Sequence, residues 1–386
     1  MYIKRNLEKK ISQLSKNYPV VAVVGPRQSG KTTLVKHLFP DKKYISLENV
    51  DTRSFAKNDP RNFLETYRDG VIIDEAQYAP ELFSYIQEIV DTNQIKGEFI
   101  LTGSQNFLLL EKITQSLSGR VAIATLLPLS LEELSKKQKN NPMEKILAKG
   151  FYPNAYQMKI DAGEWYQNYI KTYLERDVRT MKNIGDLGIF QKFIKLCAGR
   201  IGQILNLSSL ANDCGVSHNT IRSWISILEA SYVIFLLQPY YENFNKRLIK
   251  MPKIYFYDTG VASSLLGVSN HKQLSSHPFI GGLFESFIIS ELIKKSFNNG
   301  LNPDIYYWRD KTGHEVDCLY KSGGKNFAIE IKSAKTINSD FFNNLDYLQN
   351  ISKNKFTDFI LVYGGEDNQQ RKNAQVLSWK SIDKLE

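Results

Sequence analysis

Cysteine is scarce in this chain of 386 residues: there are three, Cys197, Cys214 and Cys318, and no C-x-x-C pair. Their wide spacing excludes a disulfide framework and a cysteine-rich zinc site, and it is typical of proteins in a reducing cytoplasm. No apolar run approaches the roughly 18 residues that a membrane span needs, and the first residues are not followed by the apolar core of a signal peptide. We therefore expect a soluble, cytoplasmic protein without a membrane partner.

Internal repeats and low-complexity tracts are also missing, and a hydrophobic content of 42% is that of a globular protein. The length predicts two or three domains rather than one core. The net charge is +10, which favours a polyanionic partner such as DNA. This excess is spread over both halves of the chain, so by itself it is weak evidence for nucleic acid.

Between residues 19 and 130, short apolar runs alternate with helical patterns. The runs are residues 20–24, 44–47, 71–73, 99–101 and 121–127. Continuous apolar strands separated by helices predict an α/β fold with a parallel sheet that is covered on both faces.

The first of these runs leads directly into a complete G-x-x-x-x-G-K-T sequence, which is typical of a phosphate-binding loop. We expect the loop residues to bind ATP, and they are Gly25, Pro26, Arg27, Gln28, Ser29, Gly30, Lys31, Thr32 and Thr33. The glycines let successive backbone N–H groups point at phosphate oxygens, and the helix that follows directs its positive end at the same phosphates. Lys31 would contact the β- and γ-phosphates, and the Thr32 hydroxyl would ligate Mg²⁺.

Acidic and hydroxyl side chains follow two further strands. Asp74 and Glu75 come directly after the apolar run 71–73, where Asp74 would hold the Mg²⁺ shell and Glu75 would activate the attacking water. Residues 99–101 lead into Thr102 and Ser104, either of which could contact the γ-phosphate or the water; Ser104 is our candidate.

These motifs in this order resemble the AAA+ ATPases. More closely, the chain resembles a family of prokaryotic AAA+ proteins with a winged-helix and nuclease-like C-terminal region. The other sequence motifs that support this resemblance are residues 101–104, 118–120, 127–130, 173–177 and 315–317. The resemblance implies a possible homo-oligomeric AAA+ ring in which a neighbouring subunit supplies an arginine to the γ-phosphate. Arg120 is the candidate for that arginine, and Arg176 or Arg179 could serve as lid arginines; a surface ion pair is the alternative for each.

Residues 207–225 fit a helix-turn-helix, with Gly215 at the turn and Ser217 as the cap of the second helix. The buried stripe of that helix would leave four side chains outside that can contact bases or phosphates: His218, Asn219, Arg222 and Ser223. The cations Lys246, Arg247, Lys250 and Lys253 follow in a wing-like hairpin that could contact the DNA backbone. Winged helices also bind proteins, so both partners remain open.

The C-terminal segment has the order helix, three strands, helix, strand, which is the core order of PD-(D/E)XK nucleases. Asp317 and Glu330 would share a divalent metal with the carbonyl of Ile331, and Lys332 would polarise the attacking water. Glu285 on the first helix would add a metal ligand or a water-binding carboxylate, a pattern similar to Holliday-junction resolvases. Strand alternation alone can produce an E-x-K pattern on a solvated face, and the fold can serve as a DNA-binding platform without cleavage.

The sequence therefore predicts an AAA+ P-loop NTPase parallel sheet with a helical lid, a winged helix-turn-helix domain and a C-terminal PD-(D/E)XK nuclease-like α/β domain. The expected boundaries are residues 1–130, 131–195, 196–270 and 271–386. The expected activity is ATP hydrolysis with ATP and Mg²⁺, coupled to the remodelling or cleavage of DNA. The alternatives are ATP-driven DNA binding without cleavage, and a signalling ATPase whose winged helix binds protein partners.

Overall fold

The computed structural model of the chain divides into two compact units, which are described separately below. It describes residues 2–104, 115–158, 160–173, 186–240, 250–268, 270–352 and 355–385. The first unit is Met1–Leu129 with Ala230–Tyr232 and Ser296–Leu301, and the second is Ser130–Glu229, Val233–Lys295 and Asn302–Glu386. The expected domain boundaries at residues 130, 195 and 270 stay predictions.

The first unit is built on a five-stranded sheet in the order β2-β3-β4-β1-β5, and every strand pair is parallel. Its strands are β1 (Val20–Val24), β2 (Lys43–Ser46), β3 (Val71–Asp74), β4 (Phe99–Gly103) and β5 (Val121–Thr125). Its helices are α1 (Glu8–Asn17), α2 (Lys31–Leu38), α3 (Val50–Asn58), α4 (Pro60–Glu65) and α5 (Leu82–Asn93), with the 3₁₀ turn η1 (Ala76–Tyr78). The predicted parallel sheet and all five of its strands are thus confirmed.

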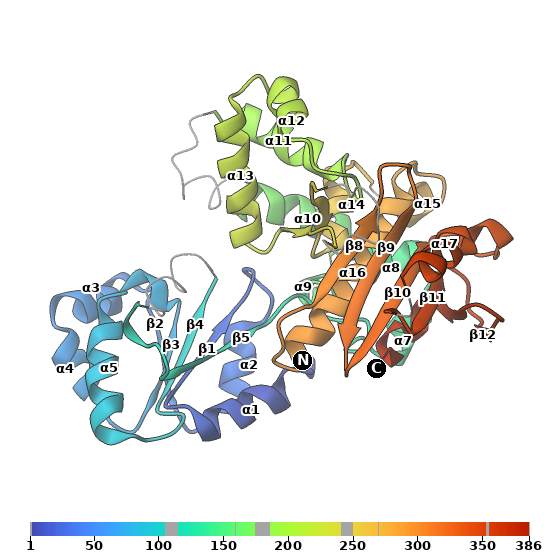
Figure 1. Cartoon of the computed structure of the whole chain (residues 1–386). Helices are drawn as coiled ribbons and strands as arrows, with labels where there is room; N and C mark the ends of the chain where they lie inside the picture. Colours follow the sequence, from blue (N-terminus) through green and yellow to red (C-terminus); the bar gives the residue numbers. More distant parts are fainter. Residues whose placement is uncertain are drawn as a thin grey trace. The chain divides into compact units, whose positions relative to one another are not determined.

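Helices cover both faces of this sheet (Figure 1). On one face, Ile11 of α1 and Leu34 of α2 pack in one buried cluster with Val21, Val23 and Ile100 of the strands. Helices α3, α4 and α5 lie on the other side of the sheet (Figure 1). Because all strands run the same way, the segments that follow β1, β3 and β4 meet at one edge of the sheet.

The second unit begins with short helices and a helix-turn-helix. The helices are α7 (Lys136–Lys139), α8 (Met143–Lys149), α9 (Asn154–Gln157), α10 (Ala162–Tyr169), α11 (Leu187–Ala198), α12 (Leu207–Cys214) and α13 (His218–Ala230). A turn separates α12 from α13: Gly215 has a φ of 71°, and the Ser217 hydroxyl accepts a hydrogen bond from Thr220 N at 3.1 Å. Ile221 and Leu228 are fully buried, as the predicted stripe requires.

A short antiparallel pair, β6 (Ile234–Leu237) and β7 (Lys253–Phe256), follows the helix-turn-helix. After it come α14 (Thr259–Leu265), α15 (His271–Leu274) and the long α16 (Ile280–Asn298). The residues that join β6 to β7 include Lys246 and Arg247, which lie outside the described ranges.

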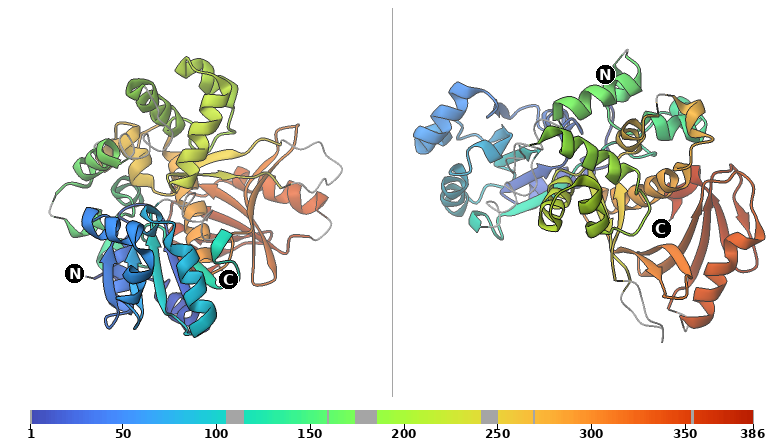
Figure 2. Two further views of the ribbon diagram at one scale, coloured as in Figure 1. Left: turned by 90° about the vertical axis from the view of Figure 1, so that its left-hand side faces the viewer. Right: turned by 90° about the horizontal axis from the view of Figure 1, so that it is seen from above.

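A six-stranded sheet in the order β12-β13-β11-β10-β9-β8 completes the second unit. Its elements are β8 (Ile305–Arg309), β9 (Glu315–Ser322), β10 (Lys325–Lys332), η3 (Ser339–Phe342), α17 (Asn343–Ile351), β11 (Asp358–Tyr363), β12 (Gln369–Gln370), β13 (Gln375–Ser378) and η4 (Trp379–Lys384). Strands β8, β9 and β10 form an antiparallel meander, and β11 pairs parallel to β10. Helix α17 lies against this sheet (Figure 2). Its Leu345 and Leu348 are buried in one cluster with Trp308, Val316 and Ala328 of the strands.

No helix in the described ranges is both long enough and apolar enough to cross a membrane.

Candidate functional site

The phosphate loop lies between β1 and α2, and its glycines are required by the backbone. Gly25 has a φ of 148°, and a Cβ there would collide with the carbonyl oxygen of Leu126. Gly30 has a φ of 97° and is the N-cap residue of α2. The loop therefore joins strand to helix in the geometry that directs backbone N–H groups at an anion.

Lys31 is buried inside this loop. Its ammonium donates hydrogen bonds to the carbonyl oxygens of Gly25 at 3.0 Å and Pro26 at 2.8 Å. Burial lowers the pKa of Lys31 to about 8, although the nearby carboxylates of Glu75 and Asp74 oppose this shift. The lysine is thus held by backbone oxygens rather than by a carboxylate.

Asp74 and Thr32, the two predicted Mg²⁺ ligands, are brought together. The Thr32 hydroxyl donates to the Asp74 carboxylate at 3.0 Å, and the Tyr44 hydroxyl donates to it at 2.7 Å. The Thr102 hydroxyl also donates to Asp74. A carboxylate and a hydroxyl at one point are hard oxygen donors of the kind that Mg²⁺ takes together with nucleotide phosphates, so these residues fit the ion.

Glu75 follows Asp74 in a left-handed conformation with a φ of 55°, which is uncommon for a residue other than glycine. Its carboxylate is buried and accepts hydrogen bonds from the Ser104 hydroxyl at 2.8 Å and from the amide of Gln77. The structure therefore brings Ser104 to Glu75, while Thr102 contacts Asp74. Such local strain is commonly retained at functional sites.

Three side chains at this site were missed by sequence reasoning: Arg5, Tyr44 and Gln77. The buried guanidinium of Arg5 donates hydrogen bonds to the carbonyl oxygens of Ser29 and Leu127, each at 2.7 Å. Because Ser29 belongs to the phosphate loop, these bonds stabilise the loop. Nothing around Arg5 in the sequence indicates this contact. Tyr44 lies on the strand next to β3, so a search of the neighbouring strand for hydroxyl groups could have found it.

Arg120 lies at the opposite edge of the sheet from the phosphate loop. It precedes β5, where Val121 pairs with Val20 at the amino end of β1. Its guanidinium forms an exposed ion pair with Asp91, with Nη2 at 2.8 Å from the carboxylate. Within one chain Arg120 does not reach the loop, and its expected contact with the γ-phosphate of a neighbouring subunit stays a prediction. Arg176 and Arg179 lie outside the described residues.

In the second unit, Asp317, Glu330 and Lys332 meet on two neighbouring strands. Cys318 of β9 pairs with Ile329 of β10, so Asp317 and Glu330 occupy the next position of the ladder. Lys332 Nζ lies 2.6 Å from Glu330 and 3.4 Å from Asp317, and Ile331 N donates to Asp317 at 2.8 Å.

The Glu330 carboxylate is buried, and no group in the described residues donates a hydrogen bond to its Oε2 atom. Burial, reinforced by the nearby charge of Asp317, raises the pKa of Glu330 to about 8. The contribution of Asp317 is the repulsion expected of two carboxylates that could share a cation, so this pair fits a metal ion.

Glu285 does not fit the predicted three-carboxylate metal site. Its Oε1 atom accepts hydrogen bonds from Lys253 Nζ at 2.9 Å and from the Tyr255 hydroxyl. Lys253 also forms an ion pair with Glu315. Across the described part of the chain, no three His, Cys, Asp or Glu side chains converge as a metal-binding group. In this structure Glu285 is thus bonded to Lys253 and Tyr255, and its role as a metal ligand or a water-binding carboxylate stays a prediction.

The same contacts correct the prediction for Lys253. It was expected on a basic wing that contacts DNA, but its side chain is only 4% exposed. Lys250 is exposed, as are His218, Asn219 and Arg222 on α13, while Ser223 is half-buried. The exposed surface of α13 thus has three of the four predicted residues, and the fourth, Ser223, is only partly exposed.

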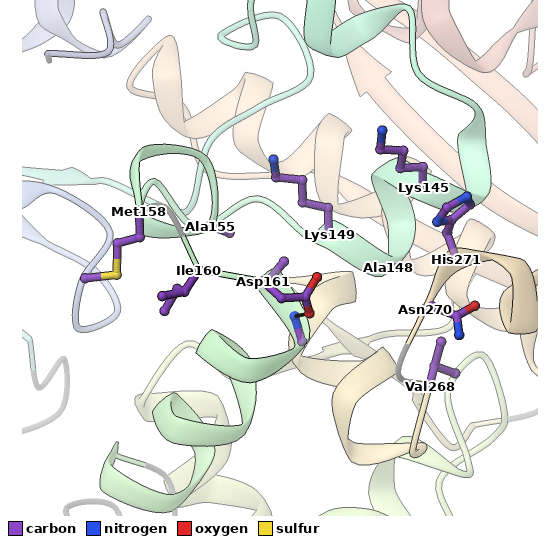
Figure 3. Close-up of a pocket in the computed structure, with 12 residues that line it drawn as sticks. Lys145, Ala148, Lys149, Ala155, Met158, Ile160, Asp161, Val268, Asn270 and His271 are labelled. Carbon is purple, nitrogen blue, oxygen red and sulfur yellow. Dashed lines mark hydrogen bonds between the residues drawn. The ribbon is translucent and has the colours of Figure 1, made fainter.

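A cavity of about 250 Å³ in the second unit lies among α8, the approach to α10 and the segment before α15 (Figure 3). Its charged lining residues are Lys145, Lys149 and Asp161, with His271 beside them. The Asp161 carboxylate accepts a hydrogen bond from Gly163 N at 2.8 Å and so caps α10 (Figure 3). None of the residues predicted from sequence lines this cavity.

The chain matches three family descriptions. Residues 17–135 match an AAA domain, residues 140–272 match a domain of unknown function (DUF8612), and residues 280–382 match another (DUF4143). Together with the phosphate loop and the parallel sheet, the first match defines the N-terminal region as an AAA-type P-loop ATPase domain.

The chain is 30% identical over 323 residues to an uncharacterized protein of Mycobacterium tuberculosis, which covers 82% of this chain and 71% of the relative. It belongs to the same protein family as this mycobacterial relative. An uncharacterized protein of Methanocaldococcus jannaschii is 24% identical over 383 residues, covering 85% of this chain and 76% of that protein.

Among solved structures, the chain is similar to a Walker-type ATPase of Pyrococcus abyssi, with 16% identity and a TM-score of 0.42 over 68% of this chain and 96% of that one. AMPPCP-bound DnaA of Aquifex aeolicus is similar at 14% identity and a TM-score of 0.30, over 58% of this chain and 85% of that one.

Proposed function

We propose that this ATPase acts on DNA: ATP hydrolysis in the AAA domain drives remodelling or cleavage of DNA bound by the helix-turn-helix and by a nuclease-like C-terminal domain. The observation that carries this proposal is the meeting of Asp317, Glu330 and Lys332 on neighbouring strands of a sheet in which β10 and β11 are parallel and β8–β10 form a meander. Two carboxylates beside one lysine can hold a cation and polarise water next to a phosphodiester.

In the AAA domain, Lys31 would contact the β- and γ-phosphates, and Thr32 and Asp74 would hold Mg²⁺ bound with ATP. The bound ion would neutralise charge on the phosphates. Glu75, oriented by Ser104 and Gln77, is the candidate to accept a proton from the attacking water. Arg120 is the candidate to complete this site in a neighbouring subunit of a homo-oligomer, since its own loop is out of reach.

DNA contact is supported by the composition of the exposed surface of α13. His218, Asn219 and Arg222 are exposed there, and these residue types can hydrogen-bond to base edges or phosphates. The positive net charge of the chain agrees with an anionic partner.

Binding without cleavage is the second candidate, and one observation favours it. Lys253 and Tyr255 already engage the Glu285 carboxylate, so the cluster offers two rather than three carboxylates for a metal. A domain of this kind would serve as a platform that holds DNA while ATP hydrolysis remodels it.

The two candidates are separated by one assay of the full-length protein with forked, four-way and linear DNA, with and without ATP and with Mg²⁺, Mn²⁺ or EDTA. We expect salt-dependent DNA binding and metal-dependent cleavage of at least one DNA form. Asp317→Ala should remove metal binding and cleavage, whereas Lys332→Ala should remove only cleavage, and ATP turnover should survive both. Binding without any cleavage favours the platform, and the absence of DNA binding in every condition would refute the proposal.

A further inference from the structure

Lys253 has an unusual position for a lysine of a predicted wing. It starts β7 yet is buried, with its ammonium 2.9 Å from Glu285 and in contact with Glu315. The ring of Tyr307 lies beneath it, with its centroid 5.6 Å from Nζ. A buried ammonium is costly unless anionic groups compensate it, so this lysine depends on the carboxylates around it.

The carboxylates depend on the lysine in turn. The Glu285 carboxylate is buried and is influenced by the negative charge of Asp317. Burial and this charge raise the pKa of Glu285 to about 7, even though Lys253 opposes the shift. Glu315 receives a second cation, because Arg309 Nη1 lies 3.0 Å from it. We call Glu285, Glu315, Asp317 and Glu330 the acidic cluster. It has two ends: at one end Glu285 and Glu315 contact Lys253, and at the other end Glu330 contacts Lys332.

Glu285 Oε1 cannot bind the Lys253 ammonium and a divalent metal ion at the same time. That oxygen accepts hydrogen bonds from both Lys253 and Tyr255, and the other oxygen, Oε2, faces Gly202, where an added Cβ would lie 3.3 Å from it. A divalent cation requires direct contact with carboxylate oxygens at about 2.0–2.6 Å, which an ammonium already bonded to them prevents.

We infer that Lys253 is a built-in counter-ion that occupies the Glu285 end of the acidic cluster in the place of a divalent cation, so that β7 controls whether this end can bind metal. The inference rests on the proposed metal-binding role of the same cluster. The contacts involved connect the two matched domains of unknown function, because Lys253 and Tyr255 belong to the first domain and the carboxylates to the second.

The test compares two buried lysines of the second unit in the full-length protein. Lys253→Met removes the ammonium but keeps most of the side chain. Lys294→Met is the matched control, because Lys294 is 2% exposed and paired at 2.8 Å with the buried Glu291, away from the cluster. Thermal unfolding is measured in EDTA and in Mn²⁺, and Mn²⁺ affinity is measured directly by its electron paramagnetic resonance signal.

Both variants should have a lower Tm in EDTA, since each leaves a buried carboxylate without its cation. Mn²⁺ should restore at least half of the loss in Lys253→Met and none in Lys294→Met. The dissociation constant for Mn²⁺ should be about tenfold or more lower in Lys253→Met than in the wild type, because two further carboxylates become available. Lys253→Arg, which keeps the charge, should gain no Mn²⁺ affinity.

A Lys253→Met protein that does not fold in EDTA still tests the inference, because its yield of folded protein can be compared with and without Mn²⁺. Lys253→Met/Glu285→Gln neutralises both partners and should fold without gaining Mn²⁺ affinity. Equal Tm losses in EDTA and Mn²⁺, with unchanged affinity, would overturn the inference even if the wild type cleaves DNA. A gain of Mn²⁺ affinity in a protein that cleaves no DNA would uphold it and reject the nuclease proposal instead.

Discussion

The nucleotide site and the acidic cluster of the C-terminal sheet both combine carboxylates with a buried lysine, but the lysine contacts different partners. Lys31 bonds to backbone carbonyls, while Asp74 accepts hydrogen bonds from neutral hydroxyls such as that of Thr32. Lys253 bonds directly to Glu285. A hydroxyl can turn and become a metal ligand itself, whereas an ammonium can only compete with the metal. We therefore expect the first site to take a metal-bound nucleotide, whereas Glu285 in the second site is already paired with Lys253.

The largest effect that would sharpen this comparison is expected at Glu75. Glu75→Gln should retain ATP but lower kcat by on the order of a hundredfold or more, because an amide cannot accept the proton of the attacking water. ATP binding and steady-state turnover are the measurements, with Lys31→Ala as the variant that loses binding itself.

Glu98→Gln is the matched control for Glu75→Gln, because Glu98 is also a buried glutamate but precedes β4 at the other edge of the sheet. It should leave kcat unchanged. Full turnover by Glu75→Gln would mean that another group activates the water.

The next effect in size concerns Arg120, which we propose as the arginine that a neighbouring subunit supplies to the nucleotide site. Arg120→Ala should bind ATP normally and hydrolyse it about tenfold or more slowly, and mixing it with Lys31→Ala protein should restore part of the activity. Recovery is expected because each variant retains the half-site that the other has lost.

Asp91→Ala removes the same ion pair but leaves the arginine in position, so it should hydrolyse ATP at the wild-type rate. Turnover per chain that does not change with protein concentration, together with no recovery on mixing, would exclude the role of Arg120 in a neighbouring subunit.

The sequence predicted the nucleotide site much better than the acidic cluster. Each strand of the first sheet is a continuous apolar run that ends in a polar motif, and parallel strands bring such ends together, so Gly25, Asp74 and Ser104 could be assigned to one edge. The position of each motif directly after its strand was sufficient to locate these residues, because the carboxyl ends of parallel strands lie at the same edge of the sheet.

Lys253 could not be assigned in the same way. It stands among other basic residues on a short strand, where exposure is the usual state of a lysine, and its burial depends on carboxylates at positions 285 and 315 that no local pattern connects to it. Gln77 was missed for a related reason: its contact with Glu75 follows from the left-handed turn at Glu75, which the sequence does not indicate.

A smaller effect compares two exposed arginines in DNA binding, one on α13 and one in the ATPase unit. Arg222→Ala should reduce the slope of log affinity against log salt by about one unit, since one phosphate contact is lost. Arg68→Ala, an exposed arginine of the ATPase unit, should leave the slope unchanged. Equal slopes in all three proteins would move the DNA surface away from α13.

The smallest effect concerns the pH dependence of stability at the acidic cluster. Burial and then Asp317 raise the pKa of Glu330 to about 8, well above the value near 4.3 of an unfolded chain. The folded protein therefore binds this proton more tightly than the unfolded chain. The stabilisation from it is complete below the unfolded pKa and is lost as the pH rises towards 8.

In EDTA, the Tm of the wild type should accordingly fall relative to that of Glu330→Gln between about pH 5 and pH 8, and the difference should then become constant. Asp317→Asn removes the neighbouring charge that helps to raise the pKa of Glu330, so the loss should be smaller and should end at lower pH. With Mn²⁺ present, the wild type should recover at pH 8, because the cation replaces the proton between two carboxylates that Lys332 only partly neutralises. A wild-type curve parallel to that of Glu330→Gln across this range would mean that Glu330 is already ionised in the folded protein and that Lys332 neutralises it fully.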